Sequence, residues 1–232
     1  MPTGPKAKNS SLKIDFTIKI GGEAGQGLAT MGFLLSKAFA RKGLNVFANQ
    51  VIQSRIRGGH NWFQIRVSDT RVLAPSAATD ILIALDRESS CHLKELKANS
   101  VVVFDSTQST DSTQLTELTL GCPLDIPLAK IASENGGNKI MSNIVAVAAV
   151  LGLFEYDINI LFELIRESFG DKDKAIGEVN VKVAQAGYDL VFKKVKCNKL
   201  PSLSAVEGKR KMLASGSEAV ALGALAAGCQ FI

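Results

Sequence analysis

A strand, a glycine-rich turn and a helix follow one another near the start of the chain. Apolar and polar residues alternate over residues 14–20, and this period of two predicts a strand with one face in a core. Four glycines then fall within residues 21–27. Over residues 28–39 the apolar side chains recur at spacings of three and four, which predicts an amphipathic helix. This order is typical of the first unit of a nucleotide-binding α/β domain.

The glycine-rich turn has two interpretations that the residues leave open. Glycine takes positive φ and lets a ligand come close, and the first turn of the following helix would stabilise an anion. Neither known phosphate fingerprint fits, because no Lys-Ser or Lys-Thr pair follows the last glycine and the spacing is not G-x-G-x-x-G. Glu23 would also repel a phosphate, so a closely packed strand-to-helix turn is the alternative. The candidate ligand-binding residues of the turn are Gly22, Gly25, Gln26 and Gly27.

Strand-length apolar runs alternate with helical patterns over much of the chain. Further strands are predicted at residues 44–48, 62–67, 80–85 and 101–104, and helical patterns predominate from residue 128 onward. We therefore predict an α/β fold, a three-layer α/β/α domain with a mainly parallel sheet of about five to seven strands and a Rossmann-like first βα unit.

A second candidate binding segment is the loop between the second and third predicted strands. It leaves the carboxyl end of the second strand, so it is expected at the same sheet edge as the glycine turn. Arginines there could bind a phosphate or carboxylate through two hydrogen bonds, could contact a subunit, or could simply be solvated. His60 could be an acid–base group, although a structural hydrogen bond is favoured. The candidate residues of this loop are Arg55, Arg57, Gly58, Gly59 and His60.

Composition and charge argue against several classes of protein. Hydrophobic residues make up 46% and charged residues 21% of the 232 residues, as in ordinary soluble domains. The formal net charge of +5 is modest, and no basic stripe interleaved with aromatic residues indicates nucleic-acid binding. The longest apolar run, residues 144–154, is too short to span a bilayer, and residues 1–11 lack a signal-peptide core. A cytoplasmic location without membrane contact is the resulting expectation.

The cysteines give no sign of a metal site. The chain has four, with no C-x-x-C pair among them. This spacing argues against a zinc site, an iron–sulfur cluster ligated within the chain and a disulfide framework. No catalytic residue and no metal ligand are therefore predicted.

The chain divides into four predicted parts. Residues 1–11 are a polar, disordered tail and residues 12–196 form one domain. Residues 197–212 contain a proline and many polar side chains, which is typical of a linker. The pattern of residues 213–232 predicts a new helix followed by the start of a strand, so we expect a truncated second domain there.

Two sequence blocks resemble a known family. GGEAGQGL at residues 21–28 and SRIRGGHNWFQIRVS at residues 54–68 resemble the gamma domain of the 2-oxoacid:ferredoxin oxidoreductases. The segment VNVKVAQAGYD, at residues 179–189, is similar to the closing pattern of that domain. The tail at residues 215–228 resembles the opening of the family's alpha domain, which binds the pyrimidine side of thiamine diphosphate. The order gamma before alpha is that of the fused subunit alpha of 2-oxoglutarate or 2-oxoacid oxidoreductases.

The resemblance implies a complex that oxidises a 2-oxoacid, with 2-oxoglutarate expected, to an acyl-coenzyme A while reducing ferredoxin. It implies thiamine diphosphate, magnesium and an iron–sulfur cluster carried largely by a partner beta subunit, with coenzyme A as co-substrate. This chain alone is expected to be inactive, because the alpha-domain segment that approaches the oxoacid in the family is not in it. It is expected to form oligomers, because residues 213–232 are apolar. The alternatives are a nucleotide-binding Rossmann-like module and a purely structural subunit.

Overall fold

The computed structural model describes residues 13–53, 59–108, 121–169, 173–194 and 200–231. The strands are β1 (Asp15–Glu23), β2 (Asn45–Val51), β3 (His60–Ser68), β4 (Thr79–Ala84), β5 (Leu96–Phe104) and β6 (Cys122–Asp125). The α-helices are α1 (Leu28–Arg41), α3 (Leu128–Glu134), α4 (Ser142–Leu153), α5 (Asn159–Phe169), α6 (Lys174–Lys194) and α7 (Gly216–Ala226). Two 3₁₀ helices are η1 (Arg87–Glu95) and η2 (Lys139–Met141).

The strands form one six-stranded sheet in the order β2-β3-β1-β4-β5-β6. The pairs β1–β4, β4–β5 and β5–β6 are parallel, and β3 is antiparallel to both of its neighbours. Five of the six strands therefore run in one direction, because β1 and β2 both oppose β3. The predicted α/β class with a mainly parallel sheet is confirmed. β2, which overlaps the strand predicted at residues 44–48, lies at the sheet edge and is half-buried.

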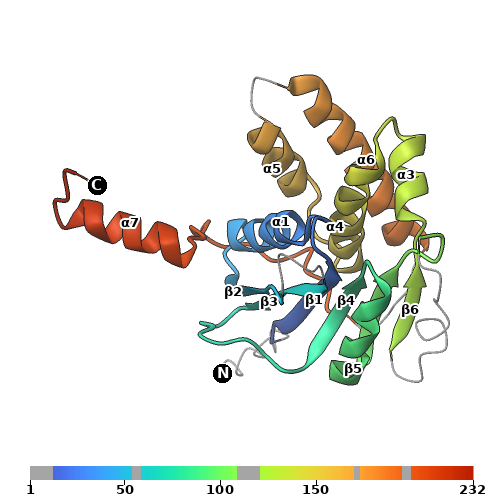
Figure 1. Cartoon of the computed structure of the whole chain (residues 1–232), viewed down its shortest axis with the longest axis horizontal. Helices are drawn as coiled ribbons and strands as arrows, with labels where there is room; N and C mark the ends of the chain where they lie inside the picture. Colours follow the sequence, from blue (N-terminus) through green and yellow to red (C-terminus); the bar gives the residue numbers. More distant parts are fainter. Residues whose placement is uncertain (1–12, 54–58, 109–120, 170–172, 195–199, 232) are drawn as a thin grey trace, which may run out of the picture.

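The helices pack on one face of the sheet, as Figure 1 shows for α1, α3, α4, α5 and α6. The inward side chains of β1, β3, β4 and β5 meet these helices in one large apolar core. Every residue of α4 from Ile144 to Gly152 is buried, because α4 lies among α6, α3 and α1 and shares the apolar core of the sheet. A Cβ on Gly187 would lie 2.8 Å from the carbonyl oxygen of Val145, so glycine lets α6 approach α4 this closely.

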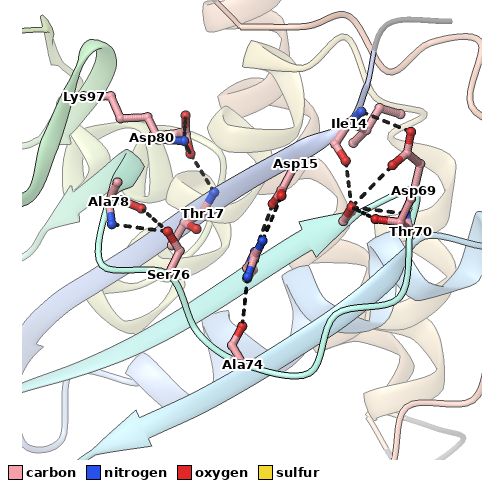
Figure 2. A network of polar contacts seen from close by, with 12 residues as sticks. Ile14, Asp15, Thr17, Asp69, Thr70, Ala74, Ser76, Ala78, Asp80 and Lys97 are labelled. Carbon is pink, nitrogen blue, oxygen red and sulfur yellow. Dashed lines mark hydrogen bonds and ion pairs between the residues drawn. The ribbon is translucent and has the colours of Figure 1, made fainter.

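The other face carries a thinner layer than the predicted three-layer domain. Under η1, a small apolar cluster of β4 and β5 packs against Leu93. Over β1 and β3 the cover is the loop at residues 69–78. Figure 2 shows how polar contacts attach this loop: Arg66 donates two hydrogen bonds to Asp15, at 3.0 and 2.8 Å, and a third to the carbonyl of Ala74. The amino end of β1 is thus closed by paired polar groups.

Residues 200–213 lie on the domain, whereas α7 extends away from it (Figure 1). The side chain of Leu203 is 1% exposed, and its N–H donates to the carbonyl of Phe154 at 2.7 Å. The N–H of Lys211 donates to the carbonyl of Ala40 at 3.0 Å. α7 begins with a capping box, in which Ser215 and Glu218 bond reciprocally, and its apolar side chains are exposed.

Candidate functional site

A cavity of about 340 Å³ opens at the sheet edge where β1, β4 and β5 end. This is the edge at which open α/β sheets bind ligands, because the carboxyl ends of parallel strands meet there. The lining residues come from the glycine turn, the strand ends and the starts of α3 and α4. They are Gly25, Gln26, Ala84, Leu85, Asp105, Gln108, Leu128, Ala129, Lys139, Ile140, Ser142 and Asn143.

The glycine turn needs glycine at two positions for different reasons. Gly25 and Gly27 have φ values of 91° and 76°, in the region that side chains rarely adopt. Around Gly25 no described atom lies within 4 Å of a Cβ position, whereas at Gly27 a Cβ would lie 2.3 Å from Nδ2 of Asn143. Gly27 also begins α1, whose first turn has no side-chain cap among the described residues and no acidic residue. The N–H groups of that turn can therefore still donate hydrogen bonds to an anion.

The turn is fixed in place by two amide side chains. Oε1 of Gln26 accepts the N–H of Glu23 at 2.7 Å, and Nδ2 of Asn143 donates to the carbonyl of Gln26 at 2.9 Å. A Cβ on Gly22 would lie 2.5 Å from Oε1 of Gln26, so only glycine leaves room for that amide. The end of β1 is in this way tied to the start of α4.

Among the residues that the structure describes, the cavity lining contains one cation and one anion, Lys139 and Asp105. The carboxylate of Asp105 is already engaged: Oδ1 accepts from the N–H and the hydroxyl of Thr107, and Oδ2 accepts from the N–H of Ala129 at 3.2 Å. Asp105 therefore shapes the loop after β5 and the start of α3. Lys139 is left as the charged group that could attract an anionic ligand.

A second polar cluster lies at the same edge on the other face of the sheet. Phe63 points into the helical core, so alternation along β3 puts His60 and Trp62 on the face under η1. Nδ1 of His60 lies 3.0 Å from Oδ2 of Asp86, and Nε2 of His60 lies 2.9 Å from Nε2 of His92. The cluster thus contains both histidines of the chain.

The cluster continues from His92 to two charged side chains. Nδ1 of His92 lies 3.1 Å from Oε1 of Glu95, and Oε2 of Glu95 pairs with Nζ of Lys19. Burial lowers the pKa of His92, an effect that the hydrogen bond with Glu95 opposes. Burial alone would raise the pKa values of Asp86 and Glu95, but hydrogen bonds outweigh burial and lower both pKa values. The hydrogen bonds of Asp86 are with His60 and Ser89. Those of Glu95 are with Lys19 and His92. Both carboxyls are therefore ionised at neutral pH.

The structure separates the residues that the sequence grouped as one site. Gly25 and Gln26 line the cavity, Gly22 and Gly27 pack beside it, and Gly59 precedes β3 with open space around it. His60 pairs with Glu23 across β1 and β3, at the predicted edge, but its side chain belongs to the cluster on the opposite face. Arg55, Arg57 and Gly58 lie outside the described residues.

Several residues of both clusters escaped the sequence reasoning. Lys139 and Asn143 enter the cavity from a helix start with no motif to mark them. Asp86 and His92 follow β4 along the chain and meet His60 only through the sheet order. Asp105 could have been identified as a site residue from the sequence, because it is a polar residue directly after a buried parallel strand.

The fold is an α/β domain with an open, mainly parallel sheet and a cavity at the carboxyl ends of its parallel strands. The profile of the pyruvate ferredoxin/flavodoxin oxidoreductase family matches residues 17–190, and the chain belongs to this family.

Relatives by sequence carry several substrate names. The chain is 28% identical over 175 residues to the ketoisovalerate oxidoreductase subunit VorA of Methanothermobacter marburgensis, covering 74% of this chain and 36% of that one. It is 24% identical over 250 residues to the 2-oxoacid:ferredoxin oxidoreductase subunit alpha of a Sulfolobus species, covering 91% and 38%. It is 28% identical to the indolepyruvate oxidoreductase subunit IorB of Archaeoglobus fulgidus, covering 74% and 93%. The chain thus spans little more than a third of the first two relatives.

Solved structures share the fold. The 2-oxoglutarate:ferredoxin oxidoreductase of Magnetococcus marinus, solved with 2-oxoglutarate, coenzyme A and succinyl-CoA bound, matches with a TM-score of 0.81 at 25% identity, over 94% of this chain and 38% of that one. The gamma subunit of a keto/oxoacid ferredoxin oxidoreductase from Geobacter sulfurreducens matches with a TM-score of 0.65 at 23% identity, over 77% and 97%.

The described residues do not fit an iron–sulfur cluster. They contain one group of three or more potential metal ligands lying together, His60, Cys91 and His92, and it includes a single cysteine. Iron–sulfur clusters are bound mostly by cysteine thiolates. Among the described helices none combines the length and hydropathy that crossing a bilayer requires.

Proposed function

We propose that this chain supplies the gamma domain of a 2-oxoacid:ferredoxin oxidoreductase, which oxidises a 2-oxoacid to an acyl-coenzyme A and reduces ferredoxin. The family match and the fold shared with the Magnetococcus marinus enzyme support this proposal. We propose 2-oxoglutarate as the oxoacid, supported by that enzyme and by similarity to the 2-oxoglutarate synthase subunit KorC of Archaeoglobus fulgidus. Ketoisovalerate and indolepyruvate, named in other relatives, are the competing substrates.

In this proposal the chain binds and positions, and the redox chemistry lies elsewhere in the complex. A partner beta subunit carries thiamine diphosphate, magnesium and the iron–sulfur cluster, and residues 213–232 begin an alpha domain. The chain on its own is then inactive.

The specific role we propose for the cavity is to bind a phosphate-bearing part of coenzyme A. The observation that carries this role is that Lys139 lines the cavity together with Gly25 and Gln26, which lead into the uncapped first turn of α1. An ammonium group and free helix N–H groups are the donors that phosphates bind in proteins. The phosphate would lie toward Lys139 and away from Asp105, because that carboxylate also lines the cavity. A volume of about 340 Å³ suits part of such a ligand, so the remainder would extend outside.

Calorimetric titration of the whole chain with coenzyme A tests this role. Lys139→Ala should weaken binding by roughly 10-fold or more, because a hydrogen bond to a charged group contributes about 1.5–3 kcal/mol. Lys130→Ala is the matched control, since this exposed lysine on α3 pairs with Glu134 and does not line the cavity. Equal affinities of the two variants would contradict the role.

The same titration separates the two alternatives. A nucleotide-binding module should bind NAD, FAD or ATP at micromolar strength and coenzyme A no better. A purely structural subunit should bind none of the four. Neither outcome would remove the family membership, which rests on the sequence match.

A further inference from the structure

The cluster of His60 and His92 brings two imidazole nitrogens together, each backed by a carboxylate on the other nitrogen of its ring. Both imidazoles are buried, with 5% and 4% of their surface exposed. Each ring directs Nδ1 at a carboxylate, of Asp86 and Glu95 respectively, and the two Nε2 atoms face each other at 2.9 Å.

The carboxylates determine which nitrogen carries hydrogen in each ring. An ionised carboxylate only accepts, so Nδ1 must be the protonated nitrogen of both His60 and His92. A neutral imidazole then has a bare lone pair on Nε2. Two such lone pairs face each other here at 2.9 Å, which is unfavourable unless a proton or a metal ion lies between them.

A third donor stands beside the facing nitrogens. Cys91 precedes His92 on η1, and one ligand atom from each of His60, Cys91 and His92 lies within 4.8 Å of the others. Cys91 is exposed, so an ion could enter from solvent on its side. Two imidazoles and a thiolate are a ligand set that zinc accepts, with a fourth position open.

The surrounding charges can accommodate a divalent ion bound together with a thiolate. When both imidazoles are neutral, the carboxylates of Asp86 and Glu95 face one ammonium, that of Lys19. The cluster then has one negative charge in excess. A zinc ion with the thiolate of Cys91 adds one positive charge and balances it. Carboxylates bonded to the outer nitrogen of each imidazole are also the usual partners of histidines that bind zinc.

We propose that His60, His92 and Cys91 form a zinc site that joins η1 to the first residue of β3. Zinc–nitrogen bonds of about 2.0–2.1 Å in tetrahedral geometry place two nitrogens roughly 3.3 Å apart, so the rings would separate by about 0.4 Å. The Cys91 thiol would lose its proton on binding. This site is independent of the cavity and of the function proposed for it, because it lies on the opposite face of the sheet.

The chain contains its own reporter for this site. Trp62 is the one tryptophan of the sequence. Its ring stacks with His60 at 6.1 Å between centroids and meets His92 edge-on at 5.2 Å. Metal bound to these imidazoles should change tryptophan fluorescence, and Co²⁺, which takes the same ligands, should in addition show a thiolate-to-metal absorption band.

The experiment is a titration of the tag-free, chelator-treated full chain with Zn²⁺ and with Co²⁺. One equivalent should bind saturably and change Trp62 fluorescence. Cys91→Ser should weaken the affinity by at least about 10-fold and remove the thiolate band, because it deletes a ligand. Cys229→Ser is the matched control, an exposed cysteine on the tail beyond α7, and should bind like the unchanged chain.

Two results would overturn the proposal. The first is no saturable binding to a chain that is folded by circular dichroism, in which case a shared proton separates the two nitrogens. The second is equal affinity of Cys91→Ser and Cys229→Ser. Because Cys91 is exposed, its substitution should leave folding intact, unlike a change at the buried His92.

Discussion

Replacing Gly27 with alanine would place a methyl group where the side-chain amide of Asn143 now lies. The Cβ would be 2.3 Å from Nδ2 of Asn143, well inside contact distance, and the backbone would keep a φ of 76°. Gly25→Ala is the matched substitution, because its φ is 91° but no described atom lies within 4 Å of the new Cβ. The pair therefore distinguishes backbone strain from close packing at one turn.

The expected magnitudes follow from these two contributions. A side chain in the left-handed region costs about 1–2 kcal/mol, and reduced freedom of the unfolded chain returns roughly 0.4–1 kcal/mol. Gly25→Ala should thus lower the free energy of unfolding by about 1 kcal/mol. Gly27→Ala should lower it by a further ~1–3 kcal/mol, because Asn143 must move and its hydrogen bond to the carbonyl of Gln26 is lost.

Urea denaturation followed by circular dichroism measures these differences, and for a chain of this length each kcal/mol should also lower Tm by about 2–4 °C. Repeating both substitutions in an Asn143→Ala background removes the obstructing amide, so there Gly27→Ala should cost no more than Gly25→Ala. The reasoning is refuted if the two single variants are equally stable, or if the difference between them survives in the Asn143→Ala background.

Three further changes test other parts of the fold. The hydrogen bond from Arg66 lowers the pKa of Asp15 below its ordinary 3.8, so this contact stabilises the fold above that pH and is lost as the pH falls through the lowered value. Arg66→Met should remove this acid-dependent contribution, at most about 1 kcal/mol for so exposed a pair, and a pH series of urea denaturation that is identical in both proteins would contradict it. Tyr156→Phe should cost about 1 kcal/mol by deleting the 3.0 Å hydrogen bond to the carbonyl of Ala38, measured in the same assay; unchanged stability would show that this bond contributes nothing. Leu203→Ala should cost about 2–5 kcal/mol because the side chain is 1% exposed; a loss under ~1 kcal/mol would mean that residues 200–213 are not part of the folded core.

The hydrophobic pattern predicted most elements because their apolar faces repeat at a clear period. α3 begins at Leu128, where the predicted helical patterns begin, and the alternation over residues 14–20 overlaps β1 from residue 15 onward. The sequence analysis did not predict that β3 is antiparallel, although the length of the connection between β2 and β3 indicates it. β2 ends at Val51 and β3 begins at His60, and so short a connection cannot hold the crossover that a parallel pair needs.

The side-chain chemistry was harder to predict because it depends on sheet order. The sequence shows His60 beside glycines and arginines, with no carboxylate near it. The structure places β1 between β3 and β4, and the segment after β4 then brings Asp86 and His92 onto His60. A local sequence pattern cannot predict a contact between residues of two strands that are separated by a third. That His60 makes a structural hydrogen bond, the interpretation favoured from sequence, agrees with its contact to Asp86.

The end of β1 explains why the glycine pattern matches no phosphate fingerprint. Gly21 and Gly22 are consecutive strand residues, so they face opposite sides of the sheet. A Cβ on Gly21 would lie 2.5 Å from Oγ of Ser89 and 2.8 Å from Cε1 of His60, in the histidine cluster.

A Cβ on Gly22 would instead lie 2.5 Å from Oε1 of Gln26, beside the cavity. Neither Gly21 nor Gly22 has a positive φ, so both are required by close approach and not by backbone conformation. The conformational requirement falls on Gly25 and Gly27 alone. The first two glycines therefore make room for two unrelated polar clusters, and the spacing G-G-x-x-G-x-G reflects packing on both faces together with one turn.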